Sequence, residues 1–119
     1  MTRILIIDDE QYRHDWFTPR LKEIVGVEVH NATNGEQALL LLRNNEYDLV
    51  FFDHDLGDDI DGSGVASTVL MNDEYKRPLA VWVHSQNWSG ARNIASKFLS
   101  VGIPAVVYDI SSCMQSPEH

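Results

Sequence analysis

The sequence has one cysteine, few basic residues and no long apolar run, and each shortage excludes a class of protein. The single Cys113 excludes an intramolecular disulfide. Only 9 of the 119 residues are Lys or Arg, and a formal net charge of -9 argues against a nucleic-acid backbone bound over a broad surface. No N-terminal apolar stretch has the length of a signal peptide or a membrane span, so we expect a cytoplasmic protein without a membrane partner.

What the chain contains is a regular alternation of β-branched runs and segments with helical spacing, which is typical of βαβ units and a parallel sheet. Its 119 residues, 44% of them hydrophobic, fit one domain with a single core. Pro19 fits best in a first helical turn after Thr18, so the first helix is expected to be kinked or to start late. We predict strands near residues 3–7, 27–30, 49–52, 79–83 and 105–108. Further helices are expected after a capping box at residues 33–36, over 64–71, and after a cap at Ser89, with Gly102 as the last stop.

Carboxylates follow two of the predicted strands. Asp8 and Asp9 end one apolar run, and Asp53 ends another and is followed by Asp55. Because the carboxyl ends of adjacent parallel strands form the crevice where ligands bind, we expect these acids to converge. Carboxylates so close together stay ionised only if a cation shares the site, and oxygen ligands suit magnesium, calcium or manganese. The sequence therefore predicts a divalent-metal site that handles phosphate.

Over residues 3–111 the order of these landmarks resembles the receiver domains of bacterial response regulators. Asp8 and Asp9 stand at that family's metal-binding acidic pair, Asp53 at its phosphoacceptor aspartate, and Ser85 at its Ser or Thr after the fourth strand. The resemblance implies that Asp8, Asp9, Asp53 and the backbone carbonyl of Asp55 bind the metal. The expected fold is a flavodoxin-like (CheY-like) three-layer α/β domain over residues 1–111, with five parallel strands in the order 2-1-3-4-5 and a short tail at 112–119.

Two features depart from the receiver pattern. Receivers carry a lysine after the fifth strand that pairs with the phosphorylated aspartate, whereas this chain has the stretch 107–111, which includes Asp109. Residues 111–119 are too few and too polar for a fifth helix, so we expect that helix to be truncated or absent. One face of the sheet should then expose an apolar patch, and such patches mark interfaces. We therefore expect a homodimer of C2 symmetry.

Histidines and amides gather near the acidic residues. His54 follows Asp53, and His84, Ser85 and Asn87 lead into the fourth helix. Together with the acids they look like the divergent receivers named for cyclic-phosphate processing. Opening a cyclic phosphodiester needs a base, an acid and a positive group. We assign catalysis to Asp53, His54 and His84, phosphate binding to Ser85 and Asn87, and the positive group to Mg²⁺ or Mn²⁺.

Several alternatives stay open. His84 and Ser85 point to opposite faces of a strand, so if Ser85 faces the crevice, His84 is an interior residue. Trp88 can stack on a base or simply pack. The leading hypothesis is a metal-dependent cyclic phosphodiesterase acting on a nucleotide or an RNA end. The alternatives are a stand-alone receiver that accepts a phosphoryl group on Asp53 from a histidine kinase in a phosphorelay, and a non-catalytic receiver-like interaction module.

Overall fold

The computed structural model describes residues 2–53, 56, 60–84 and 88–108. Within them, five strands alternate with four helices, as the sequence predicts. The strands are β1 (Thr2–Ile7), β2 (Val27–Ala32), β3 (Leu49–Asp53), β4 (Ala80–His84) and β5 (Ala105–Val107). The helices are α1 (Gln11–Lys22), α2 (Gly35–Asn44), α3 (Gly62–Met71) and α4 (Trp88–Leu99).

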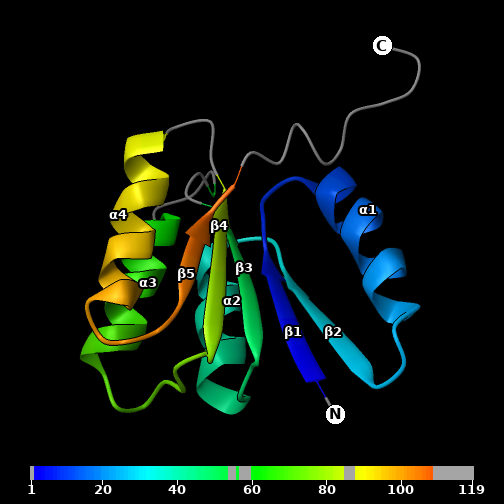
Figure 1. Ribbon diagram of the computed structural model, residues 1–119, viewed down its shortest axis with the longest axis horizontal. Helices are drawn as coiled ribbons and strands as arrows, with labels where there is room; N and C mark the ends of the chain where they lie inside the picture. The colour runs from blue at the N-terminus through cyan, green and yellow to red at the C-terminus, as the bar shows by residue number, and fades with distance from the viewer. Residues whose placement is uncertain (1, 54–55, 57–59, 85–87, 109–119) are drawn as a thin grey trace.

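The strands form one parallel sheet in the order β2-β1-β3-β4-β5 (Figure 1). This is the predicted order, and the fold is the predicted flavodoxin-like one. The carboxyl ends of the strands lie at one edge of the sheet, where the chain leaves β1 for α1, β3 for α3 and β4 for α4. None of the helices in the described ranges is long and apolar enough to cross a membrane.

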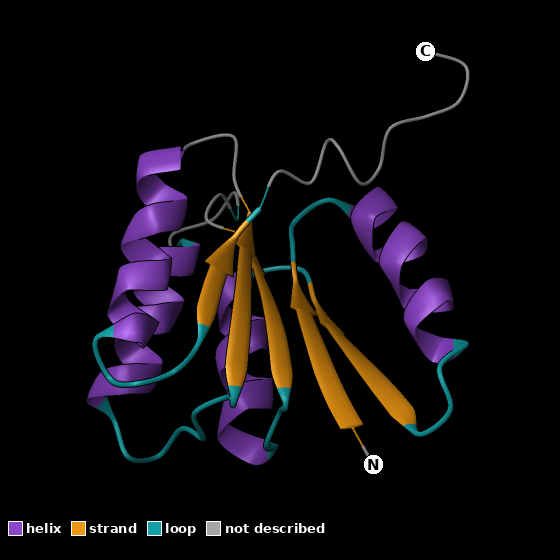
Figure 2. Cartoon of the chain, in the orientation of Figure 1, coloured by secondary structure: helices purple, strands orange, loops and turns teal. Residues whose placement is uncertain are grey.

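Each face of the sheet has its own apolar cluster, because successive strand side chains point to opposite faces. The larger cluster packs against α2, α3 and α4, and its buried strand members are Leu5, Ile7, Ala32, Val50, Phe52, Val81 and Val83. The smaller cluster packs against α1, where Phe17 and Leu21 lie on Ile4, Ile6 and Phe51. In Figure 2, α1 lies on the opposite side of the sheet from α3 and α4. The α1 side also carries Trp82 and Val106, which are 44% and 51% exposed.

Local hydrogen bonds set two of the helix ends. At the start of α2, the Asn34 side chain accepts a 2.8 Å bond from the Gln37 N–H, and the Gln37 side chain accepts one from the Thr33 N–H. The N-cap is thus Asn34, one residue later than the predicted Thr33. After α4, Gly102 has a φ of +83°, and its N–H donates to the Leu99 carbonyl. Gly102 therefore ends the helix as predicted, in a conformation that glycine adopts without strain.

The first helix was expected to be kinked or to start late, and the late start is wrong. This helix begins at Gln11 and contains Pro19 in its interior. Proline removes the N–H that would bond the Asp15 carbonyl, but Asp15 is exposed, so water can bond that carbonyl instead. Phe17 stacks on Phe51 at 5.2 Å between ring centroids, and this packing offsets the missing bond.

Two other helices start earlier than predicted. α3 begins at Gly62, because the Asp61 side chain accepts a 2.8 Å bond from the Gly64 N–H and so caps the helix before it. α4 begins at Trp88, so Ser89, the predicted cap, lies inside the helix. The expected loss of a fifth helix concerns residues 109–119, which are outside the described residues.

Candidate metal centre at the carboxyl ends of three strands

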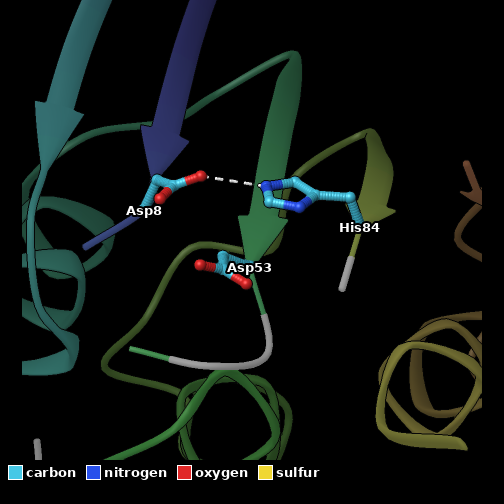
Figure 3. Close-up of side chains that lie close together, drawn as sticks. All are labelled: Asp8, Asp53 and His84. Atoms are coloured by element: carbon cyan, nitrogen blue, oxygen red, sulfur yellow. Dashed lines mark hydrogen bonds and ion pairs between the residues drawn. The ribbon is translucent and has the colours of Figure 1, made fainter. Parts of the chain in front are cut away.

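Three adjacent strands deliver one buried polar side chain each to the same point. Asp8 follows β1, Asp53 ends β3 and His84 ends β4, and they are 1%, 2% and 3% exposed. Each offers an oxygen or nitrogen atom, and these atoms lie within 4.8 Å of one another (Figure 3). The convergence of Asp8 and Asp53, which the sequence predicts from two apolar runs, is therefore present in the structure.

Strand alternation explains why the three side chains share one face. Ile4 and Ile6 pack toward α1, so the next residue of the same parity, Asp8, points to that side as well. Asp53 follows Phe51 by the same rule. Asp53 and His84 are register partners in the parallel ladder, which brings the ends of β3 and β4 level. The cluster therefore lies at the α1 side of the sheet edge.

Both carboxylate oxygens of Asp8 accept hydrogen bonds. The His84 Nε2 atom lies 3.0 Å from Asp8 Oδ2 (Figure 3), and the Glu10 backbone N–H donates to Oδ1 at 2.9 Å. Because an ionised carboxylate only accepts, the His84 Nε2 atom must carry a proton in this contact. The other ring nitrogen, Nδ1, is buried and has no hydrogen-bond partner within the part of the chain that the structure describes.

Arg13 is a member of the site that the sequence did not predict. It lies on α1, is 12% exposed, and places Nη1 at 3.2 Å from each Asp8 oxygen and at 3.3 Å from Asp53 Oδ2. One guanidinium nitrogen thus contacts carboxylates from two strands. The parity of Asp8 and Asp53, which points them toward α1, is the signal that directs attention to the first turns of this helix.

His14 fixes the backbone of the same acidic residue. Its Nε2 atom lies 2.8 Å from the Asp8 carbonyl oxygen, and its Nδ1 atom lies 2.6 Å from Asn31 Oδ1 on β2. His14 is 3% exposed. Since a carbonyl oxygen accepts, Nε2–H of His14 is the donor, and His14 holds the chain just beyond β1. The sequence gave no sign of this role, because His14 falls on a helix with no regular apolar face.

The contacts between Asp8 and Arg13 favour the charged form of both side chains. Burial alone would raise the pKa of Asp8, but the hydrogen bonds from His84 and the Glu10 N–H and the charge of Arg13 outweigh it and hold the pKa below its ordinary value. Asp8 is therefore ionised at neutral pH. Burial lowers the pKa of Arg13, and the contacts with Asp8 and Asp53 outweigh that effect and raise it.

The donor set fits a divalent cation. Two carboxylates supply hard oxygen ligands, and magnesium sites take one or two protein carboxylates and leave the remaining positions to water and phosphate oxygens. Among the described residues, Asp8, Asp53 and His84 form a group that could hold a metal ion. Asp8 and Asp53 are the residues that would hold the ion.

The other predicted site residues fall outside this group or outside the described residues. Asp9 is exposed, and its side chain is not among those brought together. Trp88 begins α4 and is 47% exposed. The remaining predicted site residues, His54, Asp55, Ser85 and Asn87, lie outside the described residues. Their roles stay predictions.

Comparisons with known proteins show a matching family and several similar structures. The family model described as the cyclic-phosphate processing receiver domain matches residues 3–100. The chain is similar to a receiver domain of a Francisella response regulator, with 20% identity, a TM-score of 0.69, and coverage of 90% of this chain and 84% of that chain. No curated protein matches the chain.

Two further solved structures contain ligands of the expected kind. A Thermotoga maritima response regulator in complex with Mg²⁺-BeF is 26% identical, with a TM-score of 0.67 and coverage of 91% of this chain and 87% of that chain. A Burkholderia pseudomallei response regulator with a phosphorylated aspartic acid, a calcium ion and citrate is 18% identical, with a TM-score of 0.69 and coverage of 96% and 65%.

Proposed function

The chain belongs to the cyclic-phosphate processing receiver domain family, and from this membership we propose that it is a metal-dependent phosphodiesterase that opens a cyclic phosphate on a nucleotide or an RNA end. The observation that carries the proposal is the buried His84, whose Nε2 atom lies 3.0 Å from Asp8 Oδ2 beside Asp53. An imidazole bonded to an ionised acid in a metal-type pocket is suited to moving a proton.

Mg²⁺ or Mn²⁺ is the cofactor of this proposal, held by Asp8 and Asp53, with Asp9 and Asp55 as predicted additional ligands. A bound ion would stabilise negative charge on the phosphoryl oxygens. A strong preference for Mn²⁺ over Mg²⁺ would instead place His84 among the ligands, because imidazole is a poor ligand for magnesium.

His84 is the base in this scheme. In the neutral ring, donation from Nε2–H to Asp8 leaves the lone pair on Nδ1, which would accept a proton from the attacking water. The water oxygen then bonds to phosphorus, one phosphorus–oxygen bond of the ring breaks, and the leaving ribose oxygen takes a proton from an acid. His54 is our prediction for that acid, and Ser85 and Asn87 are our predictions for the groups that bind the phosphate.

The test is turnover of 2',3'-cyclic nucleotides, and of RNA with a cyclic terminal phosphate, in the presence of Mg²⁺ or Mn²⁺. We expect His84→Ala and His54→Ala each to reduce turnover by on the order of a hundredfold or more, the typical contribution of one general acid or base. His30→Ala is the control, because His30 contacts Tyr47 and Glu28 and not the acidic cluster. Folded, metal-bound protein that opens none of these substrates would refute the enzyme hypothesis.

Phosphoryl transfer is the second candidate function. Asp53 is buried at the end of β3 in a receiver fold, and one structural relative contains a phosphorylated aspartic acid. Under this alternative a histidine kinase is the partner, and Asp53 is the acceptor. The stretch 107–111 has no lysine to pair with the phosphoryl group, which favours the enzyme. A non-catalytic interaction module is the remaining alternative, and the absence of turnover and of labelling on Asp53 would favour it.

A further inference from the structure

The Arg13 guanidinium occupies the space between the two acids that are expected to bind the metal. Its Nη1 atom lies 3.2 Å from both Asp8 oxygens and 3.3 Å from Asp53 Oδ2. We propose that Arg13 is the resident cation of this pocket, and that a divalent ion binds Asp8 and Asp53 only by displacing its guanidinium. The inference deepens the proposed function, because it rests on the same metal site.

Charge balance is the first reason for an exchange. Two buried carboxylates this close do not both stay ionised unless a cation lies near them. A guanidinium does not lose its proton in proteins, so Arg13 supplies that cation whenever no metal ion is bound. A divalent ion would bind the same carboxylate oxygens of Asp8 and Asp53 and would repel the guanidinium. Metal binding is therefore a replacement of one cation by another rather than an addition to an open site.

The second reason is that Arg13 already has contacts outside the pocket. Its Nε–H donates to the Tyr12 hydroxyl at 3.2 Å, and its guanidinium carbon lies 5.4 Å from the centre of the Tyr12 ring. Tyr12 is 55% exposed and lies beside Arg13 on α1. Rotation of the long arginine side chain can thus withdraw Nη1 from the acids toward Tyr12 without a movement of the helix.

The experiment is a calorimetric titration of metal-free protein with Mn²⁺ and with Mg²⁺ at constant ionic strength. We expect Arg13→Gln to bind each ion on the order of tenfold more tightly than the wild type, because a competing charge-assisted contact has been removed. The matched control is Arg20→Gln. Arg20 lies on the same helix but contacts the Trp16 carbonyl and ring, so this variant loses the same charge without altering the pocket.

A second measurement avoids dependence on the folding of the variant. In wild-type protein, the Nε–H nuclear magnetic resonance signal of Arg13 should shift as diamagnetic Mg²⁺ is added to the metal-free protein, while that of Arg20 should stay unchanged. If Arg13→Gln binds both ions as weakly as the wild type or more weakly, displacement is wrong and the metal site stands. If neither ion binds either protein, the displacement and the proposed metal site fail together.

Discussion

Replacement of Asp8 by asparagine tests whether the acidic pocket is stabilised without a metal ion. The substitution keeps the shape of the side chain and removes one buried negative charge. Two effects oppose each other: the change relieves repulsion between Asp8 and Asp53, but it weakens the attraction to Arg13 and the hydrogen bond from His84. The sign of the change in unfolding free energy therefore shows which effect is larger.

The contact distances favour a loss of stability. A pair of unit charges 4 Å apart interacts by about 4 kcal/mol at an effective dielectric constant of 20. The Arg13 nitrogen lies 3.2 Å from each Asp8 oxygen, so this attraction acts at close range and opposes the repulsion between the two carboxylates. The charge-assisted hydrogen bond from His84 adds to the attraction that the substitution weakens. Its loss lowers the stability by about 1.5–3 kcal/mol.

We expect metal-free Asp8→Asn protein to be less stable than the wild type by about 2 kcal/mol at pH 7, since hydrogen bonds to charged groups are worth this much. Urea unfolding in the presence of a chelator gives the value from the shift in midpoint at constant slope. Asp9→Asn is the matched control, because Asp9 is the adjacent acid and is exposed. A more stable Asp8→Asn variant would refute the reasoning, since repulsion from Asp53 would then exceed the attraction of Arg13.

The difference in unfolding free energy between the wild type and Asp8→Asn should depend on pH. The pKa of Asp8 in the folded protein is below its ordinary value of 3.8, because the contacts with His84, Glu10 and Arg13 outweigh burial. A carboxyl group with a lowered pKa stabilises the folded state above its unfolded pKa, and this contribution is lost as the pH falls through the folded pKa. The stability difference between the wild type and Asp8→Asn should therefore be constant near neutral pH and shrink below pH 3.8.

Three further predictions concern ligands and assembly. Millimolar Mg²⁺ or Mn²⁺ should raise the melting temperature, because a ligand that binds only the folded state stabilises it, and Asp53→Asn should abolish the shift. Acetyl phosphate with Mg²⁺ should label Asp53 poorly, since no lysine follows β5 in the stretch 107–111; efficient and stable labelling would favour the signalling function. Light scattering should give the mass of a homodimer, and a mass of 13.5 kDa at high micromolar concentration would count against it.

The fold was predictable because its signals are local. Short β-branched runs separated by segments with helical spacing gave all five strands of a parallel sheet, with boundaries within two residues. The strand order came from the resemblance to receiver domains. The start of α1 was not predictable, since the effect of Pro19 on a helix is local while the packing of Phe17 on Phe51 that offsets it is tertiary. Propensity alone gave too much weight to the proline.

The sequence predicted the position of a site residue only where that residue directly ends an apolar strand. Asp8 and Asp53 end apolar runs, so their convergence follows from a parallel sheet. The alternation of side chains along a strand predicts that His84 and Ser85 point to opposite faces, but it does not predict which of them faces the pocket. Arg13 could not be placed, because its contact depends on how α1 is rotated about its axis on the sheet.

Helix α1, which carries Arg13, also packs on the face of the sheet that bears Trp82 and Val106. Phe17 of α1 stacks on Phe51, which in turn contacts the half-exposed Trp82 at 5.6 Å between ring centroids. Tyr108 closes the row, since its ring lies 5.5 Å from that of Trp82 and 5.7 Å from that of His84. These ring contacts connect Trp82, on the α1 side of the sheet, to His84 at the metal centre through Tyr108.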